Sequence, residues 1–215
     1  MESRLSNTST YLGFFAAICL ACSSHIPVAV AGQKPIRQSE VHTDGIESPE
    51  TLDELWERSA VVVDGRVVSR RSANETFTPK NSFPPGISEP VTLARTDYVI
   101  KVNRVLKSDA VVATDMSSII VRRIGGTVDR GEYIDEVGEE GFAKFKDQGR
   151  YLLFLQPARG TAASQAVYFP VAGADSAFEV LGDRVVPLGR ATASRDMAKL
   201  GAQELVSILA RKGGN

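Results

Sequence analysis

The sequence predicts a mainly β domain with a short helix before it and an amphipathic helix at its end. After residue 60 the chain consists largely of short runs of Val, Ile, Leu, Tyr and Phe separated by Gly, Pro and Asp, which is the pattern of about seven or eight strands and their turns. Apolar residues at helical spacing precede these runs, between residues 52 and 56, and follow them, between residues 197 and 209.

The first helix is expected to begin near residue 48 and to end near residue 59. Ser48 offers a side-chain oxygen to cap a free backbone N–H, and Pro49 suits the first helical position. Leu52, Leu55 and Trp56 then share one face, which we expect to pack on the core. We interpret Trp56 as a core residue rather than a platform for a ligand, because it lies on this apolar face.

The strands are expected at residues 60–68, 93–107, 118–124, 133–137, 151–155, 167–171, 178–181 and 184–187. Gly65 favours a bulge within the first of these runs over a tight hairpin. Residues 151–155 are apolar at every position, so we expect a central strand that is covered on both sides. Residues 70–90 are polar and rich in proline, which predicts a long surface excursion.

The last helix is expected to be capped at or near Ser194 and to end at Gly213-Gly214. Its apolar stripe comprises Met197, Leu200, Leu205, Ile208 and Leu209. The opposite face lacks the dense Lys and Arg residues that are typical of a helix on a membrane surface. We therefore expect this helix to pack against the strands.

Residues 1–31 have the pattern of a signal peptide. The apolar run Tyr11–Ala21 leads to small residues at Ala29 and Ala31, so we expect cleavage after Ala31 and export to the periplasm or the medium. Two alternatives stay open. Cys22 could be the lipidated first residue of a membrane-anchored lipoprotein, although Cys19 stands where lipoboxes usually have Leu. An uncleaved anchor is disfavoured, because the run has about half of the ~20 residues that a spanning helix needs.

Residues 32–47 are polar and lack periodicity, so we expect a flexible linker before a single domain over residues 48–212. The 25 Lys and Arg residues balance the 26 Asp and Glu residues, which argues against a nucleic-acid partner. The pairs Arg70-Arg71 and Arg122-Arg123 are interpreted as solvated faces of strands.

The composition also excludes several kinds of catalysis in the exported form. Both cysteines and His25 belong to the predicted signal peptide, so only His42 remains, within the linker. Thiol chemistry and multi-histidine zinc sites are therefore excluded, and a serine–histidine triad would need this one residue. The sequence identifies no catalytic, cofactor-binding or metal-binding residue, and we predict that the protein is not an enzyme.

The densest group of ionisable residues is an acidic cluster, Asp129, Glu132, Asp135, Glu136, Glu139 and Glu140. Such carboxylates could surround a calcium ion, which prefers six to eight oxygen ligands. However, their spacing does not match an EF-hand loop, and alternation along a strand would point several of them apart. A solvated loop is the favoured interpretation, and the glycines at 125 and 126 are interpreted as a turn.

Three segments carry a resemblance to a known class of proteins: residues 60–68, 98–107 and 148–155. They resemble a recurrent class of uncharacterised exported bacterial proteins, whose strand order is similar to small barrels of the OB type, including metalloproteinase-inhibitor and netrin-like modules. The resemblance covers roughly residues 55 to 190 and implies a closed or partly open antiparallel β-barrel (OB-like). Tissue inhibitors of metalloproteinases use an amino-terminal cysteine, whereas the predicted mature end here is Gly32.

These observations predict an exported, non-catalytic binding module of the bacterial cell envelope. Its exposed segments, residues 70–92 and 126–141, would contact a protein, a peptide or a glycan. The membrane would be a partner only through a lipid on Cys22. The alternatives are an inhibitor or accessory factor of an extracellular enzyme, and a cation-binding protein that uses the acidic loop.

We predict that the exported protein begins at Gly32, because a signal peptidase would cleave after Ala31. Intact-mass analysis of the protein recovered from its native envelope checks this outcome. A mass that corresponds to an acylated chain starting at Cys22 would instead identify a lipoprotein.

Overall fold

The computed structural model describes residues 34–41, 47–77, 91–109, 116–139, 141–158 and 167–214. These residues lie within one compact unit, Lys34–Asn215. In the described ranges ten strands form two sheets, and the helices are short and few. The predicted mainly β, barrel-like fold is therefore confirmed. The predicted signal peptide lies outside the described residues.

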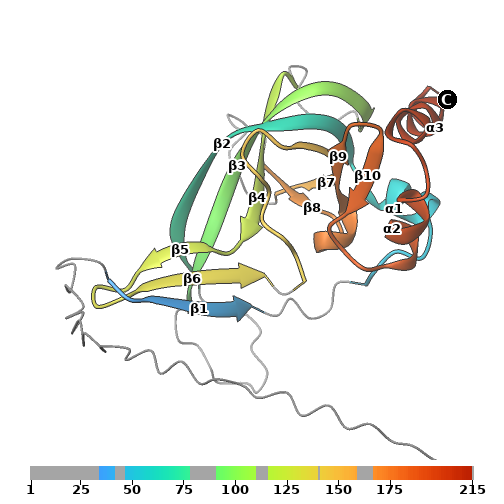
Figure 1. The fold of residues 1–215 in the computed structure, drawn as a ribbon. Helices are drawn as coiled ribbons and strands as arrows, with labels where there is room; N and C mark the ends of the chain where they lie inside the picture. Colours follow the sequence, from blue (N-terminus) through green and yellow to red (C-terminus); the bar gives the residue numbers. More distant parts are fainter. Residues whose placement is uncertain are drawn as a thin grey trace, which may run out of the picture. The chain divides into compact units, whose positions relative to one another are not determined.

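The larger sheet closes on itself to form a barrel (Figure 1). Its ring consists of β2 (Val61–Phe77), β3 (Val91–Ser108), β4 (Ser118–Ile124), β8 (Val167–Pro170) and β7 (Arg150–Pro157). Each strand pairs with the next in this order, and β7 pairs again with β2. The pairs are antiparallel except β4–β8, which is parallel and departs from the expected all-antiparallel barrel.

A hairpin extends this sheet beyond the ring. It consists of β9 (Ala177–Leu181), which pairs with β7, and β10 (Arg184–Pro187). Gly182 has a φ of 63° in the two-residue turn between them, which confirms the predicted hairpin. The helices gather at this end of the barrel: α1 (Leu52–Arg58), the short η1 (Gly173–Ser176), α2 (Thr192–Met197) and α3 (Ala202–Gly213).

Strand β7 contributes to both main apolar cores. Leu153 and Leu155 point into the barrel interior, where they join Val61, Ile100, Val121 and other buried side chains. Leu152 and Phe154 point to the opposite face, where they pack with Trp56 and the apolar stripe of α3. All five residues from 151 to 155 are at most 1% exposed. The predictions of a strand covered on both sides and of Trp56 as a core residue are therefore confirmed.

The smaller sheet consists of β1 (Ile36–Val41), β6 (Ile134–Glu139) and β5 (Gly126–Asp129), in that order. It lies beside the second half of β2 and the first half of β3, which pair with each other (Figure 1). Residues 36–41, which are expected to belong to a flexible linker, instead form a strand parallel to β6. The polar side chains of this segment give no apolar alternation from which a strand could be predicted, because β1 is attached to β6 mainly through backbone pairing.

Strand β2 is much longer than predicted. Its second half, residues 70–77, pairs with β3 where the sequence suggested a surface excursion, and residues 78–90 lie outside the described part. Cross-strand pairs that join Ser72 to Thr96 and Thr76 to Thr92 through their hydroxyls account for this extension. A shift in register between Asp64 and Gly65 confirms the predicted bulge.

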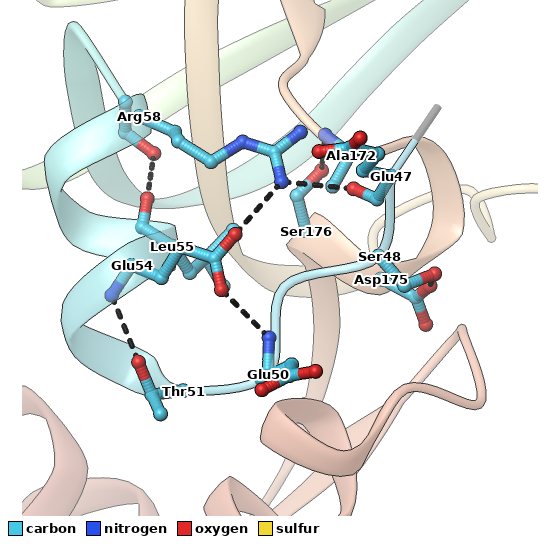
Figure 2. A network of polar contacts seen from close by, with 11 residues as sticks. Glu47, Ser48, Glu50, Thr51, Glu54, Leu55, Arg58, Ala172, Asp175 and Ser176 are labelled. Carbon is cyan, nitrogen blue, oxygen red and sulfur yellow. Dashed lines mark hydrogen bonds and ion pairs between the residues drawn. The ribbon is translucent and has the colours of Figure 1, made fainter. Parts of the chain in front are cut away.

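Helix α1 is capped by Thr51 rather than by Ser48. The Thr51 hydroxyl accepts a hydrogen bond from the N–H of Glu54 at 3.1 Å, and the Glu54 carboxylate accepts one from the N–H of Glu50 at 2.9 Å. Figure 2 shows these contacts. Ser48 instead donates to the Asp175 carboxylate of η1 at 2.7 Å. Ser48 therefore connects the segment before α1 to η1 instead of capping the helix.

The carboxyl-terminal helix is interrupted, so that α2 and α3 replace the single predicted helix. The prediction of Ser194 as a cap is wrong, since this residue lies within α2 and donates to a backbone carbonyl of η1 at 3.1 Å. Asp183 lies at the break between the two helices. Its backbone oxygen accepts from the N–H of Ala202 at 2.8 Å and satisfies a donor at the start of α3. The predicted burial of Leu205 and Leu209 is confirmed.

One end of the barrel is closed by the segment from Phe142 to Lys146. Phe145 inserts between Tyr98 and Tyr151, with ring centroids 4.9 and 4.6 Å away. The Tyr151 hydroxyl accepts a hydrogen bond from the N–H of Lys146 at 2.7 Å. The barrel interior is thus filled by side chains up to this end.

Burial raises the pKa of the Tyr151 hydroxyl above its ordinary value of 10.0, although the hydrogen bond from Lys146 acts in the opposite direction. The unfolded chain therefore loses this proton first, and the free energy of unfolding should fall as the pH rises above about 10. Tyr151→Phe should weaken this fall. Burial also raises the pKa of Tyr168, so part of the effect should remain.

Urea unfolding at several values between about pH 8 and about pH 11 measures this dependence. Tyr133→Phe, in the β5–β6 hairpin away from the barrel interior, is the matched control. An equal slope in Tyr151→Phe and in the unmodified protein would contradict the prediction.

Candidate functional site

A pocket of about 230 Å³ lies between the barrel strands β2, β3 and β4 on one side and the β5–β6 hairpin on the other. Arg70 and Ser72 line it from β2, and Gly126, Thr127 and residues 136–139 line it from the hairpin. These residues belong to the two segments that are predicted from the sequence to contact a ligand, residues 70–92 and 126–141. The structure brings them together at one pocket, although as strands rather than as loops.

Glycine keeps the floor of this pocket open. Gly125 and Gly126 have φ values of 104° and 142°, which side chains disfavour. A Cβ on Gly126 would lie 2.7 Å from Oγ1 of Thr96 and 2.9 Å from Oγ of Ser72. Because Thr96 donates to the carbonyl of Gly125 at 2.8 Å, its oxygen accepts from Ser72 at 3.0 Å. The predicted glycine turn therefore packs against two oriented hydroxyls, of which that of Thr96 is buried and that of Ser72 belongs to an exposed residue.

Arg123 forms a buried part of the pocket wall. Its side chain is 4% exposed, and it donates to the carbonyls of Ala143 at 2.7 Å and Phe142 at 3.0 Å. It also lies 3.4 Å from the Glu139 carboxylate and covers the Phe142 ring. Burial lowers the pKa of Arg123, against the opposing effect of Glu139. The interpretation of the Arg122-Arg123 pair as a solvated face is wrong for Arg123, because strand alternation turns it inward.

The other arginines of the two pairs lie closer to the surface. Arg122 binds both carboxylate oxygens of Asp97 across the β3–β4 pair, at 2.7 and 3.0 Å. The hydrogen bonds to Asp97 raise the pKa of Arg122. Arg70 and Arg71 are exposed, as predicted, and Arg70 lies 3.4 Å from Asp147. Arg70 is therefore the member of these pairs that presents an accessible charge to the pocket.

The acidic cluster does not converge on one point. Its members pair with separate cations: Asp129 with Lys34, Asp135 with Arg130, Glu136 with Lys144 and Glu139 with Arg123. The hydrogen bond from Lys34 lowers the pKa of Asp129. Glu132 is exposed, and Glu140 lies outside the described residues. Over the described ranges, no three His, Cys, Asp or Glu side chains form a group that could hold a metal ion.

A second cavity of about 190 Å³ adjoins the pocket. Gln38 and Ser39 of β1 line one side of it, while Glu136, Gly138 and Lys144 line the other and also belong to the first pocket. The two cavities therefore run side by side along β6.

The first pocket suits the binding of polar groups. Its wall combines the hydroxyls of Ser72, Thr96 and Thr127 with charged side chains, and no histidine or cysteine is among the described residues that line it. His42 lies outside the described residues. Ser72 and Thr96 could not be predicted as site residues from the sequence, because short hydroxyl side chains on strands carry no motif.

No family model matches the chain, and no curated protein matches it in sequence. None of the helices among the described residues is long and apolar enough to cross a membrane.

Arg123→Met should destabilise the protein by about 3 kcal/mol, because it removes a buried charge partner and the donors to two carbonyls of the segment that closes the barrel. Urea unfolding measures the change. Arg71→Met, at an exposed position of β2, should change the stability by less than about 0.5 kcal/mol. Equal effects of the two substitutions would contradict the structural role of Arg123.

Proposed function

We propose that this protein is an exported, non-catalytic binding module of the bacterial cell envelope, and that its first pocket receives a polar part of a protein, a peptide or a glycan. One observation carries the proposal. Two polar segments that are far apart in sequence, residues 70–72 and 126–139, converge to build an open pocket on an otherwise filled barrel.

The filled interior directs binding to the outside of the barrel. Val63, Ile100, Leu153 and Tyr168 are among the side chains that pack the inner space, each at most 3% exposed. Some small barrels hold a ligand inside, but here the inner volume is occupied by the protein itself. The first pocket, between the barrel strands and the β5–β6 hairpin, is open and could receive a ligand instead of the barrel interior.

The position of the pocket on the ring also supports a binding role. Thr96 and Tyr98 line it from β3, and Arg123 and Ile124 line it from β4. These are the second and third strands of the ring in chain order, and OB-fold proteins bind ligands on the face of their second and third strands. The near-neutral charge of the chain favours a partner other than a nucleic acid.

The chemistry of the wall favours a ligand with hydrogen-bonding groups. The exposed Thr127 hydroxyl and the guanidinium of Arg70 offer donors to the pocket, and the Ser72 hydroxyl oxygen offers an acceptor. Glu136, ion-paired with Lys144, offers a carboxylate at its rim. The signal-peptide pattern of residues 1–31 supports export, and in the exported protein these pocket side chains would be accessible to components of the cell envelope.

Thr127→Trp should reduce binding at least about tenfold, because a large side chain at this exposed, pocket-lining position would fill the entrance. The tagged full chain is expressed in its native envelope, bound components are captured by affinity, and the amounts recovered with each variant are compared by quantitative mass spectrometry.

Thr192→Trp is the matched control, since it places the same side chain on the exposed first residue of α2. Both variants must show the unfolding midpoint of the unmodified protein. Equal recovery of every captured component with Thr127→Trp and Thr192→Trp would refute the pocket as the binding site.

A further inference from the structure

The described side chains of β1, residues 36–39, add almost no apolar surface to the fold. The residues from 34 to 39 are all exposed, and the Ile36 side chain is 66% exposed. The hairpin beneath β1 has its own small core of Ala94, Val128 and Val137, to which β1 contributes nothing among the described side chains. The β5–β6 hairpin therefore does not need β1 in order to remain packed on the barrel.

The attachment of β1 is mainly a backbone ladder. Its six residues align in parallel with those of β6, from Ile36 opposite Ile134 to Val41 opposite Glu139. The N–H of Ile134 also donates to the carbonyl of Pro35 at 2.9 Å. A backbone ladder recognises an extended conformation rather than particular side chains, so the edge of β6 can accept other extended segments.

The side-chain contacts of β1 and of Lys34, which precedes it, show which segments would fit. Lys34 forms an ion pair with Asp129 at 2.6 Å, and the Arg37 guanidinium lies 4.2 Å from the centre of the Tyr133 ring. Ser39 donates to Asp135 at 2.5 Å. The hairpin thus presents two carboxylates and an aromatic face to its neighbour, which favours a peptide with basic and hydroxyl side chains.

The same edge continues into the two cavities. Gln38 and Ser39 of β1 line the second cavity together with Glu136 and Lys144, and these last two residues also border the first pocket. A strand in the place of β1 would therefore set its side chains next to the proposed binding site.

We propose that the edge of β6 is a binding site for an extended basic peptide of a partner protein, and that β1 occupies this edge until such a peptide replaces it. This inference rests on the proposed binding function and specifies the partner as a peptide that adds a strand. In the resting protein β1 acts as an internal competitor.

The experiment uses a fluorescein-labelled peptide with the sequence of residues 34–41, titrated by fluorescence anisotropy with the full chain. Ser39→Pro removes both a backbone donor of β1 and the hydroxyl that binds Asp135. We expect this variant to bind the peptide at least about tenfold more tightly than the unmodified protein. Ile36→Ser changes an exposed side chain and keeps the ladder, so it should bind the peptide like the unmodified protein.

A second peptide, with alanine in place of Lys34 and Arg37, should bind the Ser39→Pro variant at least about fivefold more weakly. The unfolding midpoint of the variant verifies that the barrel remains folded. Equal binding by Ser39→Pro and the unmodified protein would overturn the inference, as would equal binding of the two peptides.

A concentration-dependent dimer that Ser39→Pro converts to a monomer would also overturn it, because the occupant would then be the β1 strand of a second copy. These outcomes are independent of the capture experiment with Thr127→Trp. A failed titration rejects the β6 edge alone, whereas a failed capture comparison rejects the pocket.

Discussion

The fold depends on the position of β7, which closes the ring of strands. It pairs with β2 on one side and with β8 and β9 on the other, and its side chains fill the barrel interior on one face and the helix-covered core on the other. Loss of this strand would open the ring and separate both cores at once. The run Tyr151–Leu155 is therefore the part of the sequence in which burial constrains residue choice most strongly.

The candidate site depends on a different constraint, the close approach of the β5–β6 hairpin to β2 and β3. Gly126 permits that approach, because a side chain there would collide with Ser72 and Thr96. Arg123 stabilises the adjoining wall by joining β4 to the carbonyls of Phe142 and Ala143. A polar pocket thus lies next to a packed aromatic interior, with one buried guanidinium between them.

The sequence predicted the elements that have strong local patterns. Residues 118–124 and the hairpin around Gly182 were found in place, because alternation and turn chemistry are local signals. Strand β1 and the second half of β2 were missed, since their polar residues become strands only through distant partners such as Asp135 and Thr96. The site was predicted only as two separate segments, because their meeting depends on how the ring closes.

The carboxylate of Asp175 joins the segment that precedes α1 to the segment that precedes α2. It accepts hydrogen bonds from Ser48 at 2.7 Å and from the N–H of Ala191 at 2.8 Å. Asp175 also lies so close to Gly189 that a side chain at position 189 would collide with it. The first turn of the domain and the segment that leads into the last two helices therefore share one anchor. Loosening of the chain at Ser48 is therefore expected to be coupled to loosening at Ala191, because both segments lose the same carboxylate partner.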